Sequence, residues 1–471
     1  MSLNLKLYNT LTGSLETFKS LKKGTVRMYT CGPTVYDVPH VGNYRAFLFF
    51  DLVKRYLWFL GYEVKHVMNI TDVDDKIIAK CVKENVSLET LTAKFTDVFK
   101  TDAEVLGIEL PELLPKATEH IKEMIDLIKV LINNNNAYKT DDGSVFFKID
   151  SFDDYGSLSE IELDHLASTE RVADDEYGKE NPQDFALWKK WKEQDGEIGW
   201  DSPWGRGRPG WHIECSAMSM KYLGEEFDIH CGGVDLLFPH HENEIAQSVC
   251  GTGKSFVQTW LHCDHLLVDG AKMSKSLGNF YTLNDVMERG HSAMALRYLL
   301  TSSHYRQKVD LTNEHLYSAG QAVQRLQDFR RRLVEAAGKV TSHQAESPVL
   351  ADFSSAMKQD LNVSEGLAVV FDWIRETNRK IDSQNMSPNE AAAGLIALER
   401  IDSVLSVLTD DLIQITDEEQ ALVSEREVAR KAKNWSRSDE IRDIFRTKGY
   451  ELEDTPKGTV VKRIYKTTAE S

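Results

Sequence analysis

The sequence predicts an α/β fold with a parallel sheet, followed by a helical region and a small basic C-terminal part. Residues 24–70 run through a strand, a loop, a helix and a second strand, which is the order of a βαβ unit. A second strand–turn–helix–strand pattern spans residues 227–268, and residues 292–412 show helical periodicity with few glycines. With 471 residues the chain is too long for one ordinary core, so we expect roughly three or four domains.

The first unit begins with a predicted strand at residues 24–31, in which Val26 and Met28 face one way. An amphipathic helix follows over 42–60, and a second strand over 62–70. The loop between the first strand and the helix lies at the carboxyl end of that strand. Open α/β sheets bind their ligands there.

The later elements follow from the same periodicities. Residues 75–135 are mostly helical, and the mixed, polar stretch 137–200 is typical of an insertion. We expect a strand at 227–231, a helix at 240–249 and a single strand at 260–268. Residues 415–420 are a plausible hinge into the last domain.

Composition indicates a folded protein of a reducing compartment. Hydrophobic residues make up 41% of the chain, no apolar run approaches membrane-spanning length, and the N-terminus lacks the pattern of a signal peptide. We therefore expect a cytoplasmic location and no membrane partner. The six cysteines are better interpreted as thiols or metal ligands than as disulfides: Cys31, Cys81, Cys215, Cys231, Cys250 and Cys263.

The charge is unevenly distributed. The net charge of −18 argues against indiscriminate binding of polyanions. Between Arg426 and Lys466, however, twelve Lys and Arg residues stand against seven Asp and Glu residues. This basic stretch can still contact nucleic acid.

The stretch PHVGN, which ends at Asn43, stands at the mouth of the first predicted helix. A helix N-terminus presents unpaired N–H groups and a partial positive charge, so it suits a phosphate. His40 and Asn43 can donate hydrogen bonds, and Gly42 allows a flat ring to approach the backbone. Taken alone, the pattern favours an ordinary helix cap with a surface histidine.

The stretch AKMSKSLGN, residues 271–279, places two lysines on a loop that follows a strand. Lys272 and Lys275 can offset the charge that builds on a leaving pyrophosphate. The alternative is a solvated basic loop, but Lys-Met-Ser-Lys-Ser is far more specific than a generic basic run.

A third group has the residue types of a metal site. Cys31 ends the first strand, Cys215 lies near a helix start, and His240 and Glu244 are four residues apart on one helical face. Thiolates, an imidazole and a carboxylate suit zinc. Because no Cys-x-x-Cys pair is present, spacing alone favours buried structural cysteines and satisfied histidines.

Together, PHVGN and KMSKS resemble the paired signatures of class I aminoacyl-tRNA synthetases. Longer strings resemble the cysteinyl-tRNA synthetase family over essentially the whole chain: MYTCGPTVYDVPHVGN, NITDVDDKI, WHIECSAMS, FDIHCGGVDLLFPHHENEIAQS, KMSKSLGN and EDTPKGTVVKR. The usual first signature is His-Ile-Gly-His, whereas this chain has Asn43 at the last position. Asparagine can donate a hydrogen bond but cannot carry a proton charge, which puts an acid role there in doubt.

The resemblance implies a Rossmann-like catalytic domain with a parallel sheet and an insertion, a helical stem-contact and bundle domain, and a small anticodon-binding module. The expected boundaries are 1–135 and 201–291 for the two catalytic halves, 136–200 for the insertion, 292–415 for the helical domain and 416–471 for the anticodon module.

The resemblance also implies one zinc ion per chain, held by Cys31, Cys215, His240 and Glu244 and joined by the substrate thiolate. An apolar pocket separates cysteine from serine weakly, whereas zinc separates them by ligand softness. Trp211 is expected to wall the amino-acid pocket; the alternative is a core tryptophan.

For ATP with Mg²⁺, the resemblance places His40, Gly42 and Asn43 at the phosphates. Lys275, supported by Lys272, is expected to stabilise the transition state. Gly232, Gly233 and Asp235 are expected at the adenosine, with Asp235 at the ribose; the alternative for Asp235 is a turn residue. The implied reaction activates L-cysteine to cysteinyl-adenylate and then loads it on the terminal ribose of tRNA(Cys), without a protein nucleophile.

The basic tail resembles the anticodon module of the family. Trp435 is expected to stack on an anticodon base, while Arg430, Lys433 and Arg437 meet phosphates. The alternative is that Trp435 anchors a small core. We expect the chain to act as a monomer.

Two rival hypotheses remain at this point. One is a ligase of the same family that loads cysteine onto a small amine, which needs no anticodon module; the basic tail argues against it. The other is a non-catalytic tRNA-binding or regulatory protein on the same scaffold, against which the intact KMSKS string and the intact ligand set argue.

Overall fold

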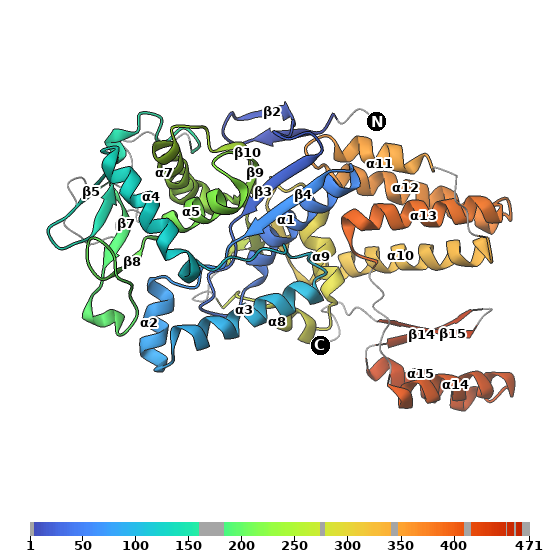
Figure 1. The fold of residues 1–471 in the computed structure, drawn as a ribbon. Helices are drawn as coiled ribbons and strands as arrows, with labels where there is room; N and C mark the ends of the chain where they lie inside the picture. The colour runs from blue at the N-terminus through green and yellow to red at the C-terminus, as the bar shows by residue number, and fades with distance from the viewer. Residues whose placement is uncertain are drawn as a thin grey trace.

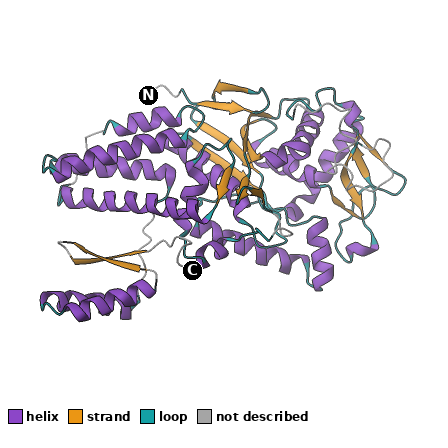
Figure 2. Cartoon of the chain, turned by 180° about the vertical axis from the view of Figure 1, so that it is seen from behind, coloured by secondary structure: helices purple, strands orange, loops and turns teal. Residues whose placement is uncertain are grey.

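The computed structural model describes residues 4–159, 183–273, 278–340, 347–408, 416–448, 450–455 and 458–463. A parallel sheet with helices on both faces is followed by a helical bundle, and a small unit near the C-terminus is set apart from both (Figures 1 and 2). The predicted α/β class is confirmed.

The central sheet has four parallel strands in the order β10-β9-β3-β4. Their bounds are Thr25–Thr30 for β3, Glu63–Met68 for β4, Phe227–Gly233 for β9 and Val257–Cys263 for β10. From β3 the chain crosses to β4 on one side, whereas from β9 it crosses to β10 on the other. The strand order therefore reverses between β3 and β9, and open α/β sheets bind ligands at such a point.

Helices bury both faces of this sheet (Figure 1). Helix α1 (Val41–Phe59) packs on one face, and α5 (Trp211–Leu223) and α7 (Glu242–Thr252) pack on the other. Val26 and Met28 belong to the core under α1, while Tyr29 belongs to the opposite core. The side-chain period of two along β3 thus divides the strand between two cores.

The segment 260–268 corrects one prediction, because it forms two strands instead of one. Strand β10 ends at Cys263, and β11 (Leu266–Val268) joins a different sheet. At the break, the N–H of Asp264 donates to the carbonyl of Tyr305 at 2.8 Å, so the backbone leaves the central sheet there.

The predicted insertion contains an antiparallel sheet in the order β5-β6-β7-β8. Its fourth strand, β8, lies beyond the expected boundary at residue 200. The strands are β5 (Ala137–Lys139), β6 (Val145–Phe147), β7 (Phe185–Lys190) and β8 (Gly207–Pro209). The helices before it, in the stretch predicted to be helical, are α2 (Asp75–Glu84), α3 (Leu88–Val105) and α4 (Ile121–Asn133).

The helical region after the sheet forms long, neighbouring helices (Figure 1). They are α9 (Ala293–Ser302), α10 (Asn313–Ala337), α11 (Val349–Met357), α12 (Val363–Asp382) and α13 (Pro388–Leu405). A buried ion pair connects this region to helix α1: Arg297 Nη2 lies 2.5 Å from Asp51 Oδ2. The smaller elements are β1 (Lys6–Asn9), β2 (Ser14–Thr17), β12 (Ala271–Lys272), α8 (Leu283–Glu288) and β13 (Val309–Leu311).

The C-terminal unit pairs two helices with a hairpin: α14 (Asp417–Lys431), α15 (Trp435–Thr447), β14 (Tyr450–Thr455) and β15 (Gly458–Arg463). The hinge predicted at 415–420 is wrong for its described part, because α14 begins inside it. Thr416 and Glu419 form a reciprocal capping box, which starts the helix. Residue 415 lies outside the described residues.

Candidate active site and metal centre

A cavity of about 450 Å³ opens at the carboxyl ends of β3 and β9, where the strand order reverses. The cavity extends from the candidate metal ligands to the N-terminal end of helix α1. Ten of the residues predicted from sequence line it: Cys31, His40, Gly42, Asn43, Trp211, Cys215, Gly233, Asp235, His240 and Lys272.

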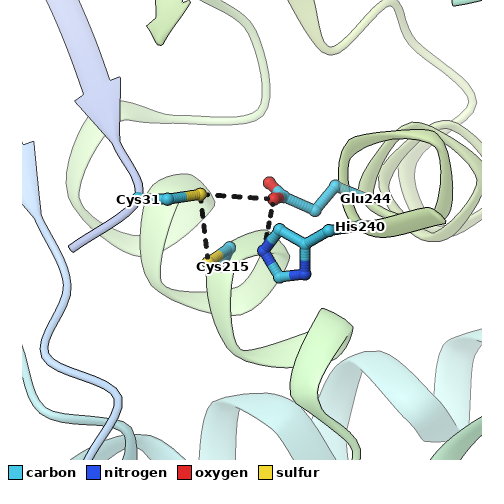
Figure 3. Close-up of side chains that lie close together, drawn as sticks. All are labelled: Cys31, Cys215, His240 and Glu244. Carbon is cyan, nitrogen blue, oxygen red and sulfur yellow. Dashed lines mark hydrogen bonds and ion pairs between the residues drawn. The ribbon is translucent and has the colours of Figure 1, made fainter. Parts of the chain in front are cut away.

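Cys31, Cys215, His240 and Glu244 converge on one another (Figure 3). The first three of them line one end of the cavity. Their ligand atoms all lie within 4.8 Å of one another. Cys31 Sγ is 3.9 Å from Cys215 Sγ and 3.8 Å from Glu244 Oε1, and His240 Nε2 is 3.0 Å from the same carboxylate oxygen. All four side chains are buried.

His240 lies in a different backbone conformation from the one predicted. The predicted helix 240–249 begins only at Glu242, and His240 lies in a preceding π-helical turn, Leu237–His241, in which Phe238 is extended. His240 still reaches Glu244, because the turn leads directly into α7. The i,i+4 spacing was therefore the right signal, although it acts through an irregular backbone.

These separations fit a tetrahedral metal site. Two sulfurs bound to one zinc ion at tetrahedral angles lie about 3.8 Å apart, close to the 3.9 Å between Cys31 and Cys215. The donor set of two sulfurs, one imidazole nitrogen and one carboxylate oxygen could hold a metal ion, and these are ligand types that zinc accepts. The residues present therefore fit the metal.

The electrostatics of the cluster favour a cation. Burial raises the pKa of Cys31 well above its ordinary value. The pKa of Cys215 is lowered to about 6, because its contacts with Cys31 and His240 outweigh burial. The pKa of Glu244 is lowered to about 2, because His230 and His240 outweigh burial. A thiolate and a carboxylate are thus held together in a buried site, beside the imidazole of His240, whose pKa is raised to about 10 because Cys215 and Glu244 outweigh burial.

Further histidines surround this cluster, and no local sequence pattern indicated their position. His230 on β9 lies 2.9 Å from Glu244 Oε2, and His241 Nε2 lies 3.4 Å from Cys31 Sγ. His262 contacts His241 at 2.8 Å. Cys31, His230, His241 and Glu244 also meet the distance criterion for a metal group, but neither His230 nor His241 lines the cavity.

Trp211 is 40% exposed and lines the cavity, so it is not the core tryptophan of the alternative interpretation. Its ring stacks on His240, with centroids 4.2 Å apart and an interplanar angle of 29°. It therefore stands beside the metal cluster as a wall of the pocket.

At the other end of the cavity, His40 is the N-cap of α1 and Asn43 is its third residue. The side-chain oxygen of Asn43 accepts a hydrogen bond from the N–H of His40 at 3.0 Å. A Cβ on Gly42 would come within 2.9 Å of the His40 ring. A side chain at position 42 would therefore force the His40 ring to shift, a constraint that the sequence did not reveal.

The two glycines predicted at the adenosine differ in position. Gly233 and Asp235 line the cavity. Gly232 does not, because the ring of His241 covers it, and a Cβ there would come within 2.3 Å of that ring. Lys272 lies on β12 and lines the cavity, whereas Lys275 lies outside the described residues.

The four residues predicted to bind tRNA lie at the turn between α14 and α15. Trp435 is 55% exposed, and the small core of this unit is made by other residues, so Trp435 is not its anchor. The guanidinium of Arg430 lies 5.8 Å from the Trp435 ring. Arg437 is paired with Glu425 at 2.8 Å and with Glu440 at 2.9 Å. Lys433 lies between the two helices.

Comparison with known proteins decides the family. Residues 17–321 match the class I (C) tRNA synthetase catalytic domain, and residues 352–409 match the DALR domain. Cysteine–tRNA ligase of Chlamydia felis is 48% identical over 470 residues, covering 98% of each chain. The chain belongs to the cysteine–tRNA ligase family. The relative from Brachyspira hyodysenteriae is 45% identical and covers 98% of this chain and 99% of its own.

Solved structures support the fold at low identity. Methionyl-tRNA synthetase of Mycobacterium tuberculosis, in complex with methionyl-adenylate, aligns with a TM-score of 0.56 at 13% identity. The alignment covers 82% of this chain and 90% of the other. None of the helices in the described ranges combines the length and hydropathy needed to cross a bilayer.

Proposed function

We propose that the chain is the ligase that joins L-cysteine to tRNA(Cys). It activates cysteine with ATP to cysteinyl-adenylate and pyrophosphate, and it then transfers cysteine to the 3′-terminal ribose of the tRNA. The single observation that supports this proposal best is the shared cavity, whose lining includes Cys31, Cys215 and His240 at one end and His40 at the other. The two reacting substrates can meet there.

The metal is proposed to be one zinc ion per chain, held by Cys31, Cys215, His240 and Glu244. When bound, zinc takes a thiol as a thiolate ligand far more readily than an alcohol, which distinguishes cysteine from serine. Trp211 closes the side of the pocket next to His240, and its contact fixes the orientation of that imidazole.

The chain positions ATP with Mg²⁺ at the mouth of α1. His40 and the first N–H groups of α1 are proposed to contact the phosphates, with Asn43 fixing the N-cap backbone. Gly233 and Asp235 are proposed at the nucleoside. Lys272 enters the cavity from β12, and Lys275 is proposed to stabilise the charge on the leaving pyrophosphate.

The C-terminal unit is proposed to bind the anticodon through Trp435 and the nearby cations. The chain is proposed to act as a monomer. All six cysteines are free thiols, which suits a reaction in the reducing cytoplasm.

The test is charging of bulk tRNA with labelled cysteine, with serine in parallel, together with cysteine-dependent exchange of pyrophosphate into ATP. We expect cysteine-only charging and cysteine-dependent exchange. Exchange without charging would support the ligase of small amines instead, and the absence of both would support the non-catalytic alternative.

Lys275→Ala provides a sharper test of the nucleotide end. We expect adenylate formation to slow on the order of 100-fold or more, because one charge-stabilising group is lost from the transition state. Cysteine affinity, measured by calorimetry, should change little. Equal losses in rate and affinity would contradict a transition-state role.

A further inference from the structure

One side of the cavity has no role in the reaction described so far. The residues proposed at the nucleoside, Gly233 and Asp235, lie at the end of β9, towards one edge of the sheet. The lining continues in the other direction to Asn69 and Thr71, which follow the edge strand β4, and to Lys76 on α2. The proposed reaction has three substrates, cysteine, ATP and tRNA, and only the first two have an assigned place in the cavity.

The loop after β3 brings an aromatic ring to this side. The N–H of Val35 donates to the carbonyl of Thr71 at 3.1 Å, and the N–H of Thr71 donates to the carbonyl of Pro33 at 3.1 Å. The loop is therefore tied to the chain that follows β4. The next residue, Tyr36, is half-buried, packs against the main core and lines the cavity. Its ring is thus supported from behind and accessible from the cavity.

A cation accompanies this ring. Lys76 is exposed, lines the cavity and places its Nζ 5.7 Å from the centre of the Tyr36 ring, within the range of a cation–π contact. The described lining holds two other Lys or Arg side chains. Arg45 is buried and donates to backbone carbonyls between α9 and β13, and Lys272 enters from β12, where it is assigned to ATP. Lys76 is therefore the one of the three that can serve a further anionic substrate.

An aromatic face with a cation beside it fits one nucleotide of a single-stranded nucleic acid. Unpaired bases stack on such rings largely without regard to sequence, and lysines bind the phosphates. We infer that Tyr36 and Lys76 hold the 3′-terminal nucleotide of tRNA, with its base on the Tyr36 ring and its phosphate at Lys76. This inference rests on the proposed function, since it gives a place to the third substrate. The ribose that accepts cysteine then enters the cavity from the side opposite to the nucleoside of ATP.

The test compares a tRNA(Cys) transcript with the same transcript shortened by its terminal adenosine. Filter binding measures the affinity of the full-length protein for each RNA. Wild type should bind the complete transcript roughly tenfold more tightly, because one stacked base contributes to binding. Tyr36→Leu keeps an apolar side chain but removes the aromatic face, so it should bind both transcripts equally. A variant that retains the difference would overturn the inference.

Cysteine-dependent exchange of pyrophosphate shows whether the ring acts on tRNA alone. In Tyr36→Leu, the exchange rate and the KM for ATP should match those of wild type, which also shows that the variant is folded. The KM for tRNA in charging should rise roughly tenfold. Tyr36→Phe retains the aromatic face and should charge tRNA as wild type does. A raised KM for ATP in Tyr36→Leu would overturn the inference, because the ring would then contact ATP.

Lys76→Gln tests the phosphate contact. A plot of log affinity for tRNA against log salt concentration should become less steep by about one unit of slope, because one phosphate contact is lost.

Lys80→Gln is the matched control. Lys80 lies one turn further along α2, is paired with Asp37 at 3.5 Å and does not line the cavity, so its removal should leave the slope unchanged. If wild type neither binds nor charges tRNA, the proposed function itself fails. If wild type charges tRNA and both Tyr36→Leu and Lys76→Gln match it, only the nucleotide subsite fails.

Discussion

The metal end of the cavity and the C-terminal unit use charge in opposite ways. Around the metal cluster, ionisable side chains are buried and contact one another directly; Glu244, for example, is 0% exposed. In the C-terminal unit, Trp435 is 55% exposed and Arg437 pairs with carboxylates at the surface. Charges in a dry site are fixed and act strongly, whereas exposed charges are weakened by water and salt.

This difference suits the two ligands proposed for these regions, cysteine and tRNA. Discrimination between cysteine and serine depends on one atom, so it requires a rigid, desolvated site. A tRNA presents many phosphates and unstacked bases, so an exposed surface of cations with an aromatic ring can bind it. Substitutions at the two regions should therefore differ in both size and kind.

The largest expected effect follows removal of a metal ligand. In Cys215→Ser, the zinc content should fall from about one ion per chain to near zero, because one of the four protein ligands of the proposed tetrahedral site is lost. Charging should be lost with it. Metal analysis of the purified protein provides the measurement. Full zinc with full selectivity for cysteine would refute the assignment.

The next effect concerns the C-terminal unit as a whole. Deletion of residues 416–471 should lower kcat/KM for tRNA roughly 100-fold, because a second contact that raises the effective concentration of tRNA is lost. Cysteine-dependent exchange of pyrophosphate should persist, since the cavity lies elsewhere. Unchanged charging of tRNA would contradict the assignment of this unit as the anticodon-binding module.

The difference between buried and exposed charges can also be measured through the free energy of unfolding. Asp51→Asn should lower the free energy of unfolding by about 3–5 kcal/mol, because it leaves the buried guanidinium of Arg297 without its partner. The measurement is urea unfolding. Glu425→Gln removes a partner of Arg437 at the surface and should produce no measurable change.

The effect of Asp51→Asn should also depend on pH. Burial raises the pKa of Asp51, but Arg297 and Arg55 outweigh it, so the folded pKa lies below the ordinary value of 3.8. The stability from this carboxylate is therefore complete at neutral pH and is lost as the pH falls below 3.8. The gap between wild type and variant should shrink over that range; a constant gap would contradict the charge-based explanation.

The smallest expected effect is that of one exposed side chain. Trp435→Ala should raise KM for tRNA roughly tenfold through the loss of one stacking contact, without changing kcat. Steady-state charging at several tRNA concentrations measures this. Arg437→Ala should have a smaller effect, because its carboxylate partners already compensate its charge. A larger effect of Arg437→Ala than of Trp435→Ala would indicate that phosphate contacts contribute most of the binding at this surface.

The sequence predicted most of the fold because the fold depends on local periodicity. The strands and helix around PHVGN appear within a few residues of their predicted bounds. The single strand at 260–268 and the hinge at 415–420 were wrong for local reasons. Asp264 bonds to a distant loop in the first case, and a capping box at Thr416 was overlooked in the second.

For the candidate site too, the sequence predicted one part and the tertiary structure decided the other. The residue types of Cys31, Cys215, His240 and Glu244 are present in the sequence, but spacing alone could not bring together a strand end, a helix and an irregular turn. Only the strand order and the packing of α5 and α7 place these atoms within 4.8 Å.

By itself, then, the sequence determined the α/β class, the order of its elements and the chemical types available at the strand ends. The tertiary structure decided which groups share one buried region: His230 and His241 around the cluster, and Gly232 under a histidine ring instead of in the cavity. The physical reason is the sequence separation over which each effect acts. Periodicity acts between neighbours in the chain, whereas burial and convergence depend on distant contacts, such as that between Cys31 and Cys215 across 184 residues.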